Sequence, residues 1–113
     1  MMSNLSEVLR KSKIAQTTFN YFKWDESGEV CAACAIGAIA LECGFKPQQY
    51  VHDRPSKARK PVYDAIKDCT GINLYDHMPG HSDQSIGDYI EFLNDKEYED
   101  FLSIAEVIAD AGL

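Results

Sequence analysis

The sequence has no hydrophobic run long enough to cross a membrane. Its longest uncharged apolar stretch, residues 30–41, spans 12 positions, whereas a transmembrane helix needs about 20. Charged and polar residues also interrupt residues 1–16, so the apolar core of a signal peptide is missing. We therefore expect a soluble protein with no membrane partner, located in the cytoplasm.

Basic residues are scarce in the second half of the chain. From Asp68 to the C-terminus the sequence has eleven acidic residues and one basic residue, Lys96, and the whole chain carries a net charge of −7. Proteins that bind nucleic acid are usually basic, because much of their affinity comes from neutralising phosphates. Nucleic acid is therefore not the partner that we expect.

One short segment has the opposite charge. Residues 46–60 contain five basic residues and one acidic residue. This basic segment could bind an anionic partner, or it could offset the acidic half of the same molecule. The candidate partner-binding residues in it are Arg54, Lys57, Arg59 and Lys60.

Alternating strand patterns, internal repeats and low-complexity tracts are also missing. Apolar residues instead recur at steps of three and four, the spacing of an amphipathic helix. Since 113 residues is an ordinary length for one domain, we predict a single all-α domain over residues 1–113, a compact bundle of about five helices. The expected apolar helical stripes cover residues 5–22, 30–43, 62–69, 86–93 and 98–109, with connections at 45–60 and 72–85.

Polar residues mark the starts of the last two expected helices. Ser82 or Asp83 suits the N-cap of the fourth helix, and Asn94 or Asp95 suits that of the last. Gly112 is placed to end the chain's last helix. The last helix is expected to bury one face made of Tyr98, Phe101, Leu102, Ala105, Ile108 and Ala109.

Residues 30–43 read VCAACAIGAIALEC and have almost no polar face. A helix that is apolar nearly all round is normally surrounded by others, so we predict the central helix of the bundle here. Gly37 costs about 1 kcal/mol relative to alanine inside a helix, which predicts a neighbouring backbone or large side chain pressed against it. Cys34, Ala38 and Leu41 share its packing stripe, whereas Cys31 lies one turn earlier.

Cys31 and Cys34 form a C-x-x-C pair that would share one helix face, as two cooperating thiols require. A thioredoxin-like motif, however, follows a strand in a βαβ pattern, and no strand is predicted here. A nucleophilic thiol would need a histidine brought close by the fold, and His77 and His81 are the candidates. Packing of small apolar residues is the simpler interpretation of both cysteines.

The same four residues are the candidate ligands of a zinc ion. His77 and His81 have an H-x-x-x-H spacing that zinc sites use. Against a zinc finger, 42 residues separate Cys34 from His77, and Pro79-Gly80 keeps the histidines off one helix face. Zinc bound at a site assembled by the fold stays an alternative, and no other cofactor is expected.

Three short motifs resemble a known family. They are CAIGAI at residues 34–39, IEFLND at 90–95 and IAEVIADAGL at 104–113. In these motifs the chain is similar to a family of short uncharacterised proteins of bacteria and their phages, a domain of unknown function, over residues 24–113. The resemblance implies a fold and a bacterial or phage origin, but no activity. Cys31 and the long basic connection depart from the family pattern.

The leading hypothesis is a small soluble protein without catalytic activity, phage-encoded or accessory, that binds another macromolecule. An as yet unknown protein is the expected partner, and the chain is expected to be a monomer or a small homo-oligomer. The alternative is a metal-binding protein or thiol-dependent enzyme that uses Cys31 and Cys34 with His77 and His81.

Overall fold

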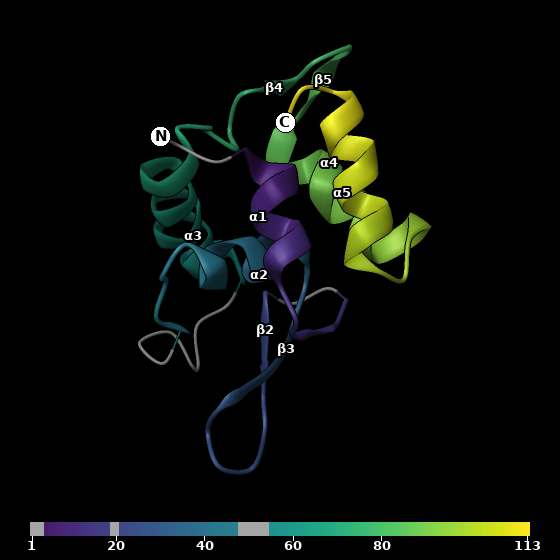
Figure 1. Cartoon of the computed structure of the whole chain (residues 1–113). Helices are drawn as coiled ribbons and strands as arrows, with labels where there is room; N and C mark the ends of the chain where they lie inside the picture. The colour runs from purple at the N-terminus through teal and green to yellow at the C-terminus, as the bar shows by residue number, and fades with distance from the viewer. Residues whose placement is uncertain (1–3, 19–20, 48–54) are drawn as a thin grey trace.

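The computed structural model describes residues 4–18, 21–47 and 55–113, apart from the side chains of residues 55–58, 81 and 82. Helices surround a core to which almost every element contributes, and the two sheets are small (Figure 1). The elements within these ranges are α1 (Leu5–Lys11), β1 (Ala15–Gln16), β2 (Phe22–Trp24), β3 (Val30–Ala33), α2 (Ala35–Glu42), α3 (Pro55–Thr70), β4 (His77–Met78), β5 (His81–Ser85), α4 (Ile86–Phe92), the π-helix η2 (Leu93–Glu97) and α5 (Phe101–Asp110).

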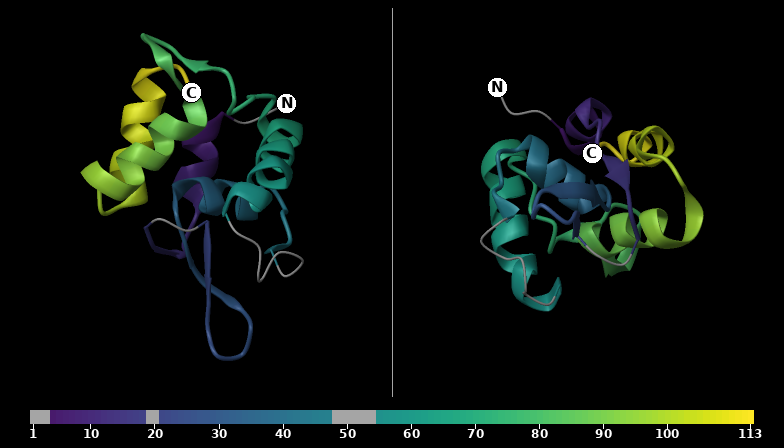
Figure 2. Two further views of the ribbon diagram at one scale, coloured as in Figure 1. Left: turned by 180° about the vertical axis from the view of Figure 1, so that it is seen from behind. Right: turned by 90° about the horizontal axis from the view of Figure 1, so that it is seen from below.

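The prediction of an all-α fold is wrong, because the chain is mixed α/β. In one sheet β3 is central, pairing in parallel with β1 and antiparallel with β2. The second sheet is the antiparallel hairpin β4–β5. The two sheets lie at opposite ends of the helical body, as the front and back views agree (Figures 1 and 2). Five α-helices are nevertheless present in the described ranges.

The helix expected over residues 5–22 ends at Lys11, where Ser12 adopts an extended backbone. Ala15 then pairs with Ala32 and Gln16 with Ala33, which begins the first sheet. Two threonines and three aromatic residues follow within positions 17–22, and both residue types favour extended structure. Apolar residues continue at helical spacing after Lys11, but the helix ends at that residue.

The segment 30–43, predicted as one helix, divides at Cys34. Its first four residues form β3, and α2 begins at Ala35 with Cys34 as its N-cap. A short, wholly apolar run has the same appearance in a buried strand and in a buried helix, so the pattern could not separate them. The helical part is buried, and it contacts α1, α3 and α4.

The prediction for Gly37 is confirmed. A Cβ atom at this position would overlap the backbone carbonyl oxygen of Tyr21. That oxygen also accepts a hydrogen bond of 3.2 Å from the Cys34 N–H. The glycine therefore lets the start of α2 lie directly against the chain that enters β2.

Both connections expected in the second half contain regular structure. Helix α3 begins at Pro55 rather than near Val62, so that Pro61 lies inside the helix and not in its first turn. Residues 72–85 include the β4–β5 hairpin, whose turn holds Gly80 at φ 82°. Ser85 caps α4, in place of Ser82 or Asp83.

The last helix starts later than predicted and buries only part of the predicted face. Its N-cap is Asp100, whose carboxylate accepts a 2.7 Å hydrogen bond from the Ser103 N–H. Leu102, expected in the core, is 61% exposed, whereas Ile104 is fully buried against the other helices. Gly112 ends the helix as predicted. Helix α5 packs mainly against α1, which joins the two ends of the chain.

Candidate functional site

The structure separates the two cysteines of the C-x-x-C pair. Cys31 is exposed in β3, and Cys34 is 4% exposed at the start of α2. Since one lies in a strand and the other caps a helix, they do not share a helix face as predicted. All four cysteines are free thiols.

His77 and Cys31 are not brought together. His77 is exposed in β4, in the sheet at the opposite end of the molecule from β3 (Figure 1). His81 starts β5, and its side chain lies outside the described part. Among the described residues, no three histidine, cysteine or acidic side chains are grouped so as to hold a metal ion.

The buried thiols are poor nucleophiles. Burial raises the pKa of Cys34 to about 12, although its Sγ accepts a 3.4 Å hydrogen bond from the Gly37 N–H. Burial, together with a hydrogen bond to Cys69, also raises the pKa of Cys43 to about 12. The thiolate is the reactive form of cysteine, so both groups are protonated and unreactive at neutral pH.

Two basic residues of the basic segment, Arg59 and Lys60, pair with other residues of the same molecule. Lys60 Nζ lies 2.9 Å from an Asp64 carboxylate oxygen one helical turn later. Arg59 Nε donates a 3.4 Å hydrogen bond to the Tyr21 hydroxyl, and its Nη2 lies 4.0 Å from Glu91 Oε1. Arg54 and the side chain of Lys57 lie outside the described residues. Of the two roles predicted for this segment, the geometry of Arg59 and Lys60 favours internal charge compensation.

Arg59 belongs to a half-buried cluster that holds three elements together. The Tyr21 hydroxyl donates a 3.1 Å hydrogen bond to Glu91 Oε1, which links the start of β2 to α4. Burial raises the pKa of Glu91 above its usual range and that of Tyr21 to about 12. On the same helix as Glu91, a Cβ at Gly87 would overlap the Tyr63 hydroxyl of α3. The close fit of these side chains indicates that the cluster around Arg59 has a structural role.

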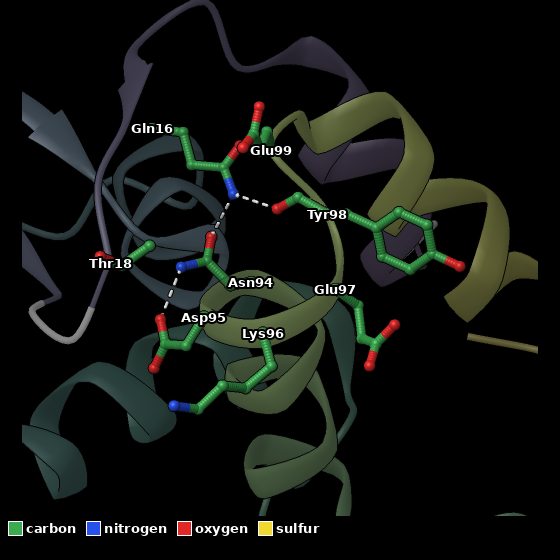
Figure 3. A pocket seen from close by; sticks show the side chains of 8 residues that line it. All are labelled: Gln16, Thr18, Asn94, Asp95, Lys96, Glu97, Tyr98 and Glu99. Carbon is green, nitrogen blue, oxygen red and sulfur yellow. Dashed lines mark hydrogen bonds between the residues drawn. The ribbon is translucent and has the colours of Figure 1, made fainter.

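A pocket that the sequence did not reveal lies beside η2. Its volume is about 300 Å³. Figure 3 shows the side chains around it, which come from β1 and the residues just after it and from η2 and the segment leading to α5. The lining residues are Gln16, Thr18, Asn94, Asp95, Lys96, Glu97, Tyr98 and Glu99.

Asn94 forms the base of this pocket and uses all of its hydrogen-bonding capacity. It is 2% exposed. Its Oδ1 accepts hydrogen bonds from the Ala35 N–H (3.0 Å) and from Gln16 Nε2 (2.9 Å). Its Nδ2 donates to the Thr17 carbonyl and to an Asp95 carboxylate oxygen, both at 2.9 Å. One side chain thus joins η2 to the first sheet and to the start of α2.

Of the two polar atoms of the Gln16 side-chain amide, only Nε2 has hydrogen-bond partners among the described residues. Its Nε2 donates to Asn94 Oδ1 and to the Tyr98 carbonyl, at 2.9 and 3.0 Å (Figure 3). Its Oε1 is buried and has no hydrogen-bond partner among the described residues. A buried acceptor left unpaired costs about 1–3 kcal/mol, and such atoms call for a specific explanation.

The pocket is acidic, and an irregular helix shapes it. Three carboxylates, those of Asp95, Glu97 and Glu99, line it beside one basic residue, Lys96. The π-helix ends where the Tyr98 N–H donates a 2.9 Å hydrogen bond to the Leu93 carbonyl. Single π-turns within helices are frequent at functional sites. The pocket is therefore the candidate functional site.

From the sequence, Asn94 was predicted as a candidate helix cap and as part of the IEFLND motif, but not as part of a pocket. The signal available was an asparagine next to the apolar residues Ile90 and Leu93, where a buried amide needs partners. The partner, Gln16, is 78 positions away and belongs to a strand that was not predicted. No local pattern connects two such residues.

No helix in the described ranges has the length and apolar character needed to cross a membrane. No family model, curated protein or solved structure matches the chain. The similarity of its three short motifs to a family of uncharacterised bacterial and phage proteins therefore stays a prediction.

Proposed function

We propose that the protein is a binding protein without catalytic activity, and that it takes a basic segment of another protein into the pocket beside η2. The observation that supports this most is the unpaired Gln16 Oε1 in a pocket lined by three carboxylates. A partner that supplies positively charged N–H donors would satisfy both features. A bacterial or phage origin and action in the cytoplasm belong to the same proposal, and four free thiols fit a reducing compartment.

The charge distribution supports a basic partner. The eleven acidic residues after position 67 give this half of the chain a negative field, which speeds the encounter with a positively charged protein and disfavours nucleic acid. An exposed ion pair contributes only about 0–1 kcal/mol. Affinity must therefore come from several contacts made at once, as a pocket with clustered carboxylates allows.

The alternative of a metal site or thiol enzyme has less support. Of its two candidate thiols, Cys34 is buried and has a raised pKa. The alternative also needs Cys31 and His77 to approach each other, and they lie in sheets at opposite ends of the molecule.

The proposal is tested by measuring binding of a fluorescent lysine-rich peptide to the full chain by anisotropy at low salt. Replacing Glu97 and Glu99 together by glutamine should weaken binding about three- to tenfold, since each carboxylate contributes an exposed ion pair. The matched control is Glu106→Gln on α5, which removes an exposed carboxylate outside the pocket and should leave affinity nearly unchanged. Equal losses in both variants, or no binding to the unmodified protein, would refute the proposal.

A further inference from the structure

We propose that the pocket recognises a primary alkylammonium group, such as the end of a lysine side chain, through a hydrogen bond from its N–H to Gln16 Oε1. The inference rests on the proposed function and specifies the group that the pocket binds. It starts from a buried acceptor, Gln16 Oε1, whose position is fixed by the hydrogen bonds of its own amide.

The orientation of the Asn94 amide is set by main-chain groups. The Ala35 N–H can only donate, so the atom facing it must be the oxygen Oδ1. The Thr17 carbonyl can only accept, so the atom facing it must be the nitrogen Nδ2. No rotation of this amide by 180° is compatible with both partners.

The orientation of the Gln16 amide follows from that of Asn94. Its inner atom faces Asn94 Oδ1 and the Tyr98 carbonyl, which are both acceptors, so this atom must be the donor Nε2. Exchanging the two atoms of the amide would place an oxygen against two oxygens. Oε1 is therefore directed away from Asn94 Oδ1 and the Tyr98 carbonyl, and no donor among the described residues reaches it.

The charges around Oε1 select the kind of donor. Glu97 and Glu99 line the same pocket as Gln16, and the side chains of all three are drawn in Figure 3. An unpaired acceptor in a pocket lined by carboxylates favours a cation that carries hydrogens. Because the described acidic residues are not grouped as metal ligands, an organic cation fits the site better than a metal ion.

An ammonium group suits this arrangement better than a guanidinium. Its three N–H donors point in different directions and can bond Oε1 and carboxylates on different sides at the same time. The donors of a guanidinium lie in one plane and suit a single carboxylate. Glu99 is exposed, so its side chain can turn toward the bound ammonium.

The test compares one peptide in three forms with the unmodified full chain. The forms carry lysine, trimethyllysine or arginine at the same positions, and their positive charge is equal. The trimethylated form has no N–H donor on its cationic group. Affinity is measured by anisotropy, and the side-chain amide signals of Gln16 are followed by NMR.

We expect the lysine peptide to bind at least about fivefold more tightly than the trimethyllysine peptide, the scale of one hydrogen bond to a charged group. It should also shift the Gln16 amide signals. In a Gln16→Met variant the preference for lysine over trimethyllysine should disappear, and this ratio does not depend on how much of the variant is folded. Putrescine serves as the free diamine, and a Gln16 shift with putrescine alone would assign the ammonium to a small molecule.

Each other outcome has a distinct meaning. Equal binding of the lysine and trimethyllysine peptides would overturn the inference and leave the proposed function standing, because charge alone would then explain affinity. Tighter binding of the arginine peptide would overturn the choice of ammonium. Failure of all three peptides and of putrescine would overturn both.

Discussion

The Asn94 side chain makes four hydrogen bonds, which connect η2 with the first sheet and with the start of α2. It satisfies a main-chain donor at the start of α2 and a main-chain acceptor just after β1, and it also orients Gln16. Hydrogen bonds in a buried network are strong, and a buried group that loses its partner is costly. The same residue thus sets both the stability of the first sheet and the direction of the unpaired Gln16 oxygen.

Replacing Asn94 by alanine should therefore destabilise the protein by about 2–4 kcal/mol, because the Ala35 N–H and the Thr17 carbonyl lose their partners. Urea unfolding followed by circular dichroism measures this change. The matched control is Asn73→Ala, which removes one exposed hydrogen bond to the Tyr75 N–H and should cost about 1 kcal/mol or less. Similar losses at both positions would show that the Asn94 network is not specially important.

At the scale of elements, helix α3 contains an internal proline, Pro61, which lowers the stability of the helix. Pro61 has no N–H to donate to the carbonyl one turn earlier, and its ring crowds that carbonyl. Pro55 starts the same helix, where a proline loses no hydrogen bond because the first helical N–H groups have no partner.

The two prolines therefore make a matched pair of substitutions. Pro61→Ala should stabilise the protein by about 1–3 kcal/mol, and Pro55→Ala should change stability by less than about 0.5 kcal/mol. Thermal and urea unfolding of both variants give the comparison. A destabilising effect of Pro61→Ala would mean that the proline ring makes a contact worth more than the missing hydrogen bond.

Apolar periodicity predicted several helices, because a helix that buries one face has apolar residues at steps of three and four along its own sequence. The stripe of Ile86, Ile90 and Leu93 is buried, as expected from its spacing. Val30–Ala33 was assigned wrongly, because a run of apolar residues this short has the same appearance in a strand and in a helix. The β1–β3 pairing joins residues 17 positions apart in strands of two and four residues, which are too short for a pattern to show.

The candidate site was hidden for a related reason. Cys31, Cys34 and His77 stood out by residue type, yet Cys34 is buried, and Cys31 and His77 lie in sheets at opposite ends of the molecule. The pocket instead depends on a contact between Gln16 and Asn94, on a π-turn and on one unpaired oxygen. All three are properties of the folded chain, and an isolated segment has none of them.

At the scale of the whole molecule, the uneven charge gives folding and binding opposite responses to salt. The net charge is −7, and the acidic residues after position 67 are opposed by a single lysine in that region. Arg59 pairs with Glu91 and so offsets one of these charges, whereas Lys60 pairs with Asp64 outside this region. The folded chain therefore retains a repulsive acidic half that a basic partner would neutralise.

Raising NaCl from about 50 to about 500 mM should weaken binding of the lysine-rich peptide about tenfold, because several exposed ion pairs are screened at once. Over the same range the free energy of unfolding should rise slightly, because repulsion among the acidic residues is screened as well. Anisotropy titrations and urea unfolding at matched salt concentrations measure the two quantities. Opposite signs would establish that salt weakens the complex without unfolding the protein, whereas a parallel fall would attribute the loss of binding to loss of structure. Salt-independent binding would contradict recognition by charge altogether and would require apolar contacts, for which the exposed Phe92 and Leu102 would then be the first residues to replace.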